Sequence, residues 1–172
     1  MADADAEITI RDAREDERDA IRELTFLAYE QYAELMEPSA WQGLKHAIAN
    51  AVATTAPAQR IVAERDGVLI GSVLLFPSAL DAYQGPVVAV PVPEMRVLAV
   101  DPAARGLGIG RLLVEECIRR ARRLGANVLG LHTSVSMRQA KALYERMGFE
   151  RYPADDFQPG GTELVMAYRL PL

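Results

Sequence analysis

The stretch VLAVDPAARGLGIGRLL, from Val97 to Leu113, constrains the fold more than any other part of the sequence. Its apolar beginning is typical of a buried strand, and the proline that follows ends regular strand pairing. Three glycines in five residues then lead into an amphipathic helix. Because a further apolar run follows at residues 127–133, the segment predicts a strand–helix–strand step in a sheet covered by helices.

The periodicity of the whole chain predicts the order βααβββαβαββ. Apolar or alternating runs predict strands over residues 7–11, 59–65, 68–76, 94–100, 127–133, 149–152 and 163–170. Helical spacing predicts helices over residues 15–35, 39–52, 109–124 and 137–147. Asp66-Gly67 is a strong hairpin signal between two of the strands. We therefore expect an α/β fold with a mixed, mostly antiparallel sheet of about six to seven strands and helices on both faces.

Each predicted helix has an apolar face and a candidate end. The side chains expected to face the sheet are Ala20, Ile21, Leu24, Leu27, Ala28, Trp41, Leu44, Ile48, Ala51, Leu113, Val114, Cys117, Ile118, Ala121, Leu124, Ala140, Leu143, Tyr144 and Met147. Ser39 and Ser136 are the expected N-caps of the second and last helices. Gly125 and Gly148 are expected to end the last two helices.

Composition limits the classes of partner. The chain has 172 residues, half of them apolar, which suits a single domain over residues 1–172. A net charge of -5 argues against the binding of nucleic acid. No apolar run approaches the ~20 residues of a membrane span. We therefore expect a cytoplasmic protein that binds neither nucleic acid nor membrane.

The cysteine and histidines suggest no metal or thiol chemistry. Cys117, the single cysteine, falls in a helical pattern and is expected to be a buried apolar side chain. His46 and His132 stand alone without metal-ligand spacing, so we expect structural or surface histidines and no metal.

The glycine-rich turn is suited to an anion. The beginning of a helix offers unpaired N–H groups, and Gly106, Gly108 and Gly110 let a ligand approach the backbone. Arg105 and Arg111 add cationic donors on either side, so a diphosphate is the expected ligand. The alternative is that the glycines only make a tight turn.

Two nucleotide motifs do not fit this turn. The dinucleotide fingerprint G-x-G-x-x-G counted from Gly106 requires a glycine where Arg111 stands. The phosphate-binding loop of nucleotide triphosphatases requires Lys-Ser or Lys-Thr, which is absent nearby.

Two motifs together resemble the GCN5-related N-acetyltransferase (GNAT) family. VDPAARGLGIGRLL is similar to its acetyl-CoA motif, R/Q-x-x-G-x-G/A after a strand, with Arg105, Gly108 and Gly110 at the fixed positions. MRQAKALYERMGF is similar to the family pattern N-x-x-A-x-x-L-Y-x-x-x-G-F. Met137 stands where the family usually has asparagine, so a contact near the cofactor is lost or supplied by another group. The resemblance covers essentially the whole chain.

The resemblance implies an acyl-CoA N-acyltransferase fold that uses acetyl-CoA as donor substrate. It places the CoA pyrophosphate on Arg105, Gly106, Leu107, Gly108, Ile109, Gly110 and Arg111, and the pantetheine arm along Leu98, Ala99 and Val100. Met137 and Tyr144 complete the expected cofactor contacts. The implied acceptor is a primary amine of a small molecule or a peptide, and a homodimer is one expected state because relatives are commonly dimers.

The resemblance also implies roles in catalysis. Glu94, at the start of a strand, is the expected base; the alternative is a strand-end glutamate that pairs with Arg96 or meets solvent. Tyr144 is expected to assist the departing CoA sulfur, and the alternative is a core tyrosine. The N–H of Leu98 is a candidate donor to the oxyanion.

The basic run and the acceptor pocket each allow more than one interpretation. The run RRARR, residues 119–123, could reach the 3′-phosphate of CoA or form a solvated face. The acceptor pocket is expected from loops at residues 29–41, 79–93 and 152–161, with Tyr83, Tyr152, Asp155 and Asp156 as candidate contacts. A non-catalytic acyl-CoA-binding or regulatory domain is the alternative function.

Overall fold

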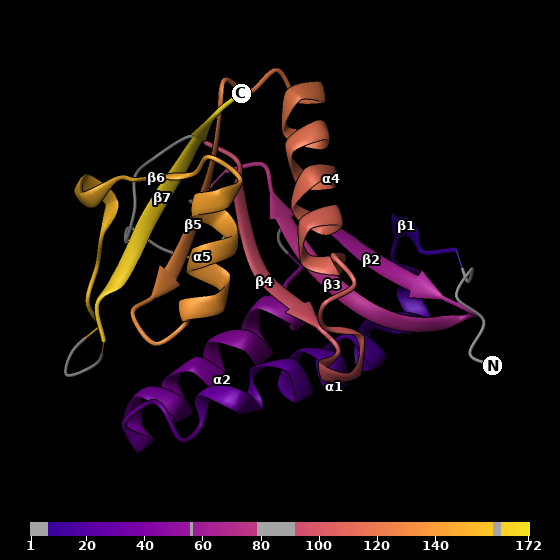
Figure 1. Ribbon diagram of the computed structural model, residues 1–172, viewed down its shortest axis with the longest axis horizontal. Coiled ribbons are helices and arrows are strands. Elements are labelled where there is room, and N and C mark those ends of the chain that lie inside the picture. Colours follow the sequence, from indigo (N-terminus) through magenta and orange to yellow (C-terminus); the bar gives the residue numbers. More distant parts are fainter. Residues whose placement is uncertain (1–6, 56, 79–91, 160–162) are drawn as a thin grey trace.

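A seven-stranded sheet forms the centre of the molecule (Figure 1). The computed structural model describes residues 7–55, 57–78, 92–159 and 163–172. Its strands are β1 (Thr9–Asp12), β2 (Gln59–Arg65), β3 (Val68–Phe76), β4 (Glu94–Val100), β5 (Val128–Ser134), β6 (Glu150–Arg151) and β7 (Val165–Pro171). They lie in the order β1-β2-β3-β4-β5-β7-β6, and β4 and β5 are the parallel neighbours in an otherwise antiparallel sheet. The predicted mixed sheet is confirmed.

Helices cover both faces of this sheet. They are α1 (Arg18–Tyr29), α2 (Pro38–Ala53), α4 (Ile109–Arg123) and α5 (Arg138–Arg146). In Figure 1, α1 and α2 lie on one side of the strands, and α4 and α5 lie on the other. Neighbouring residues of β2 show the same division, since Ile61 packs with the α4 side chains and Val62 with those of α1 and α2. In the described parts of the chain, no helix is long and apolar enough to cross a membrane.

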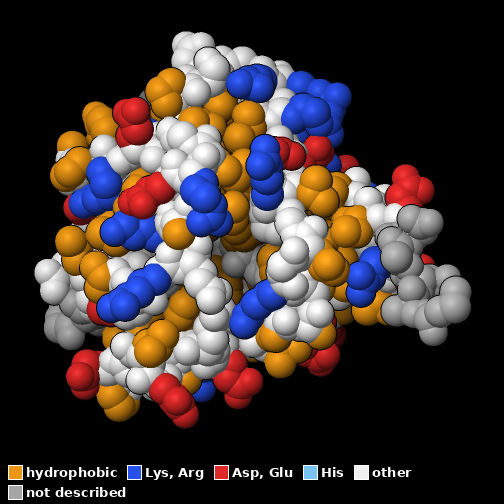
Figure 2. Space-filling model, viewed as in Figure 1, with side chains coloured by type: hydrophobic (Ala, Val, Ile, Leu, Met, Phe, Trp, Pro, Cys, Tyr) orange, Lys and Arg blue, Asp and Glu red, His pale blue; other side chains and the backbone are white. Residues whose placement is uncertain are grey.

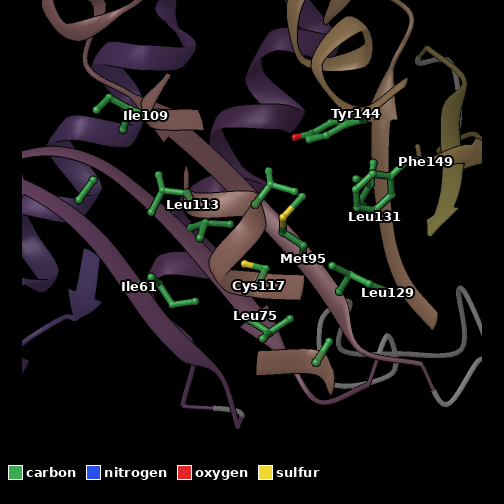
Figure 3. Close-up of a cluster of buried hydrophobic side chains, with 14 of the residues drawn as sticks. Ile61, Leu75, Met95, Ile109, Leu113, Cys117, Leu129, Leu131, Tyr144 and Phe149 are labelled. Carbon is green, nitrogen blue, oxygen red and sulfur yellow. The ribbon is translucent and has the colours of Figure 1, made fainter. Parts of the chain in front are cut away.

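The larger core lies between the sheet and helices α4 and α5 (Figure 3). Leu113, Val114, Cys117 and Ala121 all have 0% exposure because they share the inward face of α4. Burial also raises the pKa of the Cys117 thiol, which keeps it protonated and unreactive. The prediction of a buried structural cysteine is confirmed.

The hairpin between β2 and β3 follows from its two turn residues. Asp66 and Gly67 have φ values of 54° and 78°, the left-handed conformation that a two-residue turn between twisted strands requires. The hairpin register brings Arg65 opposite Val68. The predicted Asp-Gly turn is confirmed.

Strands β4 and β5 are joined only near their beginnings. Glu94 pairs with Gly130 and Met95 with Leu131, and no later pair joins the two strands among the described residues. Figure 1 shows them diverging toward their C-terminal ends, while β5 continues alongside β7. The edge of β4 beyond Met95 is therefore not used by its sheet neighbour.

A β-bulge interrupts β4 at the same point. Ser72 pairs with Ala99 and Leu74 with Arg96, so Val97 and Leu98 together lie opposite a single residue of β3. Val97 has φ 55°, which is strained for a β-branched side chain. Side chains of Arg96 and Val97 consequently face the α2 side, and Leu98 packs on the α4 side.

Some predicted positions on helix faces are wrong. Leu27 is 49% exposed and Leu124 is 51% exposed, and Ala20 is exposed as well. On α1, the buried side chain next to Leu24 is Thr25, whose hydroxyl donates to the carbonyl of Ile21 at 2.6 Å. This local hydrogen bond satisfies the hydroxyl, so Thr25 can face the core although the spacing of apolar residues did not predict it.

The two serine N-caps are also wrong. Helix α2 begins at Pro38, with Glu37 at the N-cap, because proline suits the first helical turn and Ser39 then lies inside the helix. Helix α5 has Met137 at its N-cap, and the Ser136 hydroxyl donates to Glu163 instead. Gly125 and Gly148 have φ values of 77° and 95°, as their predicted places after helix ends require.

Most of the loop at residues 79–93, which is expected to contribute to the acceptor pocket, lies outside the described residues. This part comprises residues 79–91 and includes Tyr83. Residues 160–162, which include Gly161 of the predicted acceptor loop, also lie outside.

Candidate active site

The glycine-rich turn presents free backbone amides at the start of α4. Gly106 and Gly108 have φ values of 83° and 77°, and Gly108 is the N-cap residue. The N–H of Leu112 donates to the carbonyl of Gly108 at 3.1 Å, which is the first hydrogen bond of the helix. The amides from Ile109 to Arg111 therefore have no carbonyl partner within the helix and are available to an anion.

A cleft of about 1350 Å³ opens beside this turn, between α4, α5 and the edge of β4. Leu98 and Val100 of β4 line it, and the Leu143 side chain of α5 contributes to the opposite wall. A Cβ at Gly110 would come within 3.2 Å of Leu143, so the glycine permits the close approach of α4 to α5. The cleft joins the amides of the turn to the unused edge of β4.

Basic side chains surround the outer part of the cleft. Its lining includes Arg105, Arg111, Arg119, Arg122 and Arg146. In Figure 2 the hollow between α4 and α5 is bordered by several basic groups. Among the described residues, Arg122 and Arg146 have no acidic partner within ion-pair distance, whereas Arg111 and Arg119 pair with neighbouring glutamates on α4. Two guanidinium groups are therefore available for a phosphate.

Most residues predicted to bind the cofactor lie on this cleft, and a few do not. Those on its wall are Leu98, Val100, Arg105, Gly106, Gly108, Ile109, Gly110 and Arg111. Leu107 is 48% exposed on the outside of the turn, and Ala99 is buried in its pairing with Ser72. Met137 lines a different cavity.

Arg105 connects the turn to α1. Its Nη2 donates to the main-chain carbonyl of Ala28 at 3.2 Å, near the C-terminal end of that helix, where carbonyls are unpaired and carry partial negative charge. Ala28 itself lines the cleft. Arg105 thus holds the turn against α1 in addition to facing the cleft.

A second cavity, of about 310 Å³, lies on the α2 side of the divergent strands. It is lined from α2, from Arg96 and Val97 at the bulge, from the end of β5, and from residues near Phe157. Tyr29 lines both this cavity and the cleft. The two spaces therefore approach each other at Tyr29, next to the bulge of β4.

Glu94 and His132 form a buried pair beside the second cavity. Their side chains are 2% and 5% exposed, and Oε1 of Glu94 lies 2.5 Å from Nδ1 of His132. Glu94 lies opposite Gly130, where an added Cβ would come within 2.7 Å of Oε2. The His132 ring lines the cavity, whereas Glu94 lies behind it. The glutamate is therefore held in place by His132 and given room by Gly130.

Hydrogen bonds on both ring nitrogens define the protonation of His132. Nε2 lies 3.0 Å from the main-chain carbonyl of Asp155, which can only accept, so Nε2 carries a hydrogen. Burial alone lowers the pKa of His132, but the hydrogen bond and charge of Glu94 outweigh it, and the pKa is raised above its ordinary value. The range of pH over which the His132 ring carries a positive charge beside Glu94 is thereby extended upward.

The stabilisation that this pair provides is expected to fall as pH rises. A raised folded-state pKa means that the imidazolium stabilises the fold fully below the ordinary value of 6.5 and that this contribution is lost as pH rises through the folded-state value. The free energy of unfolding of the wild type and of His132→Gln, measured in urea from about pH 6 to about pH 9, should converge at the alkaline end. A difference that stays constant would contradict a protonated ring.

Tyr144 is buried in the core beside Leu143, which lines the cleft, but Tyr144 itself is not among the described residues of the cleft wall. It is 6% exposed, and its ring centroid lies 5.8 Å from that of Phe149 (Figure 3). Burial, with added effects of Tyr29 and Tyr32, raises the pKa of Tyr144 well above 10. A phenol with this pKa can donate a hydrogen bond but is a poor acid at neutral pH. Tyr144 is therefore both a core side chain and a candidate hydrogen-bond donor.

The acidic residues near the last strand have other partners. Asp155 accepts from Arg169, and Asp156 accepts from Arg151, each at 2.7 Å. Neither aspartate nor Tyr152 is among the described residues that line the second cavity. The acidic side chain that does line it is Glu163, which accepts from Ser136.

Several site residues have only weak signals in the sequence. His132 looks like an isolated histidine because its partner, Glu94, lies 38 positions earlier. Arg146 and Tyr29 lie on two different helices, so no local pattern connects them with the glycine turn. The arrangement of the strands brings these groups together.

Comparison with known proteins agrees with this geometry. A family model described as "Acetyltransferase (GNAT) family" matches residues 18–149, a span that includes both the glycine turn and Tyr144. This chain belongs to the GNAT family. The predicted resemblance is thereby confirmed.

Curated relatives of this GNAT chain carry the name mycothiol acetyltransferase. The protein of that name from Thermomonospora curvata is 38% identical over 99 residues, which are 58% of this chain and 30% of the relative. The one from Cellulomonas flavigena is 38% identical over 103 residues, covering 58% of this chain and 28% of the relative. The chain thus matches less than a third of the length of these relatives.

Solved structures share the fold. A GNAT acetyltransferase from Brucella melitensis in complex with acetyl-CoA has a TM-score of 0.63 at 24% identity, over 97% of this chain and 89% of that one. The PaiA N-acetyltransferase of Thermoplasma acidophilum in complex with coenzyme A has a TM-score of 0.68 at 16% identity, over 95% and 99% of the two chains. At these identities the similarity shows an acyl-CoA N-acyltransferase fold.

Proposed function

We propose that this GNAT chain transfers an acetyl group from acetyl-CoA to a primary amine of a small molecule or a peptide. One observation carries the proposal: a single cleft joins the free amides at Ile109–Arg111 to the unused edge of β4. A diphosphate fits the first part and an amide-containing arm fits the second. The acetyltransferase names of the curated relatives support this reaction class.

Each part of acetyl-CoA has a counterpart in the cleft. The pyrophosphate would accept hydrogen bonds from the amides of the turn, with Arg105 and Arg111 nearby. The pantetheine amides would pair with the main chain of β4 between Leu98 and Val100, as an added strand does. This placement brings the thioester to the bulge, next to the second cavity.

The available arginines are expected to bind the 3′-phosphate of CoA. The double variant Arg122→Ala with Arg146→Ala should weaken acetyl-CoA binding about tenfold, because two charge-assisted hydrogen bonds at a partly exposed site are lost. Calorimetry with acetyl-CoA and with its 3′-dephospho analogue measures the effect, which should disappear for the analogue. Arg123→Ala, on an exposed position of α4 outside the cleft, is the matched control. Equal losses for both ligands would contradict this assignment.

The reaction requires no covalent enzyme intermediate. The amine nitrogen attacks the thioester carbon, a C–N bond forms, and the C–S bond breaks with its electron pair on sulfur. The ammonium loses one proton before attack and the nitrogen loses a second afterwards, and one proton returns to the CoA thiolate. The N–H of Leu98, displaced from the ladder by the bulge, is the proposed donor to the oxyanion.

Glu94 is the proposed acceptor of the proton from the ammonium. An alkylamine with a pKa near ~10.4 is mostly protonated at neutral pH, so proton removal has to precede attack. Since Glu94 lies behind the wall of the second cavity, a water molecule would carry the proton to it. His132 and Gly130 fix the carboxylate for this purpose.

Tyr144→Phe is expected to lower turnover about tenfold and to leave acetyl-CoA affinity unchanged, because it removes one hydrogen bond to the departing sulfur. Steady-state kinetics and calorimetry separate the two effects. Tyr168→Phe is the control, because the hydroxyl of this core tyrosine already donates to Glu145 at 3.1 Å. Turnover that is the same in both variants would remove Tyr144 from the mechanism.

A thermal-shift comparison of acetyl-CoA, NAD and ATP tests the ligand class. Acetyl-CoA at about 100 times its Kd should stabilise the fold by about 2.7 kcal/mol, whereas NAD and ATP should have little effect. Absence of stabilisation by acetyl-CoA would overturn the proposed function. Stabilisation without any amine-dependent turnover would favour the alternative of a non-catalytic acyl-CoA-binding domain.

A further inference from the structure

The second cavity has mostly apolar walls. Its apolar side chains come from α2 and the turn before it, from the bulge of β4, from the start of α5 and from the segment before β7, and include Met36, Leu44, Ile48, Val97, Met137 and Phe157. A cavity of about 310 Å³ is at the small end of the range for small-molecule sites. These walls suit a compact ligand with an apolar body.

One buried hydroxyl group in this wall lacks a partner. Oγ of Ser134 is buried and forms no hydrogen bond among the described residues, and Ser134, which is 8% exposed, lines the cavity. Ser134 and His132 are two positions apart on β5, so their side chains lie on the same face of the strand. Because an unpaired buried hydroxyl costs free energy, a ligand that hydrogen-bonds it gains affinity.

The charged groups among the described lining residues are few. Glu163 is the carboxylate, and Arg96 and His132 are the basic groups. His132 hydrogen-bonds Glu94, which lies directly behind it. Glu163 therefore suits one ammonium, and the described lining residues offer no second carboxylate to a polyamine.

We infer that the acceptor of this chain is a compact monoamine with an apolar body, bound in the second cavity with its polar end near Ser134 and Glu163. The inference rests on the proposed acetyl transfer and specifies its acceptor class. Tyr29 lines both spaces, so an amine bound here would reach the thioester beside this side chain. Polyamines and strongly cationic peptides are thereby disfavoured.

Binding of 2-phenylethylamine and of spermidine tests the inference directly. Isothermal titration calorimetry with the CoA-saturated full chain should show at least tenfold tighter binding of 2-phenylethylamine. Equal or tighter binding of spermidine, or no binding of 2-phenylethylamine, would overturn the inference. Amine-dependent release of CoA from acetyl-CoA is measured separately, so that failure of the proposed reaction is distinguished from failure of the acceptor class.

Gly43→Leu tests whether this cavity is the site. Gly43 lines the cavity from α2, and a Cβ there would meet nothing within 4 Å, so the leucine can enter the cavity without clashing with the core. The variant should keep its fold, because glycine is the poorer helix former. We expect at least tenfold weaker binding of 2-phenylethylamine and an unchanged Kd for acetyl-CoA.

Two further variants complete the test. Gln42→Leu, one position earlier on an exposed site outside the cavity, should not change amine binding. Ser134→Ala should weaken the binding of 2-phenylethylamine about fivefold through the loss of one hydrogen bond. Unchanged amine binding in Gly43→Leu would place the acceptor elsewhere and contradict the inference.

Discussion

Glu94→Gln is expected to lower kcat by about 100-fold to about 10,000-fold, the range for loss of a positioned proton acceptor. Glutamine has nearly the same shape and can still hydrogen-bond Nδ1 of His132, so the packing opposite Gly130 should be kept. The Kd for acetyl-CoA should not change, because Glu94 is not part of the cleft wall. Activity should recover partly at high pH, where the free amine no longer needs the carboxylate.

Gly130→Ala is the companion variant for Glu94. Its Cβ would come within 2.7 Å of Oε2, so the carboxylate must move although its charge stays. We expect kcat to fall here as well, without the recovery at high pH that marks loss of the base itself. A wild-type pH–rate profile in Glu94→Gln would falsify its role as proton acceptor and leave it a structural partner of His132.

Gly108→Val is expected to abolish most of the stabilisation by acetyl-CoA. Gly108 has φ 77°, a conformation that strongly disfavours a β-branched side chain, so the turn would be strained by about 1–3 kcal/mol or would rearrange. Rearrangement would misplace the amides of Ile109–Arg111 that are proposed to hold the pyrophosphate. At least a tenfold loss of affinity should accompany a lower Tm, measured by calorimetry and thermal unfolding.

Gly108→Asn distinguishes the effect of a strained backbone from the effect of an added side chain on stability and acetyl-CoA affinity. Asparagine tolerates the left-handed conformation better than valine does, and a Cβ at this position would meet nothing within 4 Å. The asparagine variant should therefore keep more stability and more acetyl-CoA affinity than the valine variant. Equal affinity in the wild type and in both variants would remove the turn from the cofactor site.

Much of the fold follows from local patterns in the sequence. Asp66-Gly67 determines a tight turn, and the spacing of Leu113, Cys117 and Ala121 defines the inward face of α4. The glycines at 106 and 108 mark the turn because their positive φ values disfavour other residues. These features depend on residues close together in the chain, so one sequence is enough to predict them.

The features that create the site depend on contacts between distant residues. Val97 has no intrinsic preference for φ 55°, so the bulge that redirects β4 could not be predicted from its residue type. The pairing of Glu94 with His132 requires the register of β4 against β5. Arg122 and Arg146 line the same cleft because α4 and α5 lie on the same face of the sheet.

The prediction of Ser136 as an N-cap failed for a related reason. Ser136 has the right spacing from Gln139 for a capping box, but a distant carboxylate, that of Glu163, takes its hydroxyl. Its neighbour Met137 is the N-cap residue and lines the second cavity. Met137 thus contributes to an apolar wall and not to the cleft beside the glycine turn.

Amine-dependent release of CoA from acetyl-CoA is the direct test of the proposed acetyl transfer. The purified chain is mixed with acetyl-CoA and each of a panel of primary amines, free thiol is followed over time, and the product is identified by mass spectrometry. We expect thiol release matched one to one by N-acetylated amine, with a higher rate for 2-phenylethylamine than for spermidine. Binding of acetyl-CoA with no amine-dependent thiol release across the panel would contradict the proposed transfer.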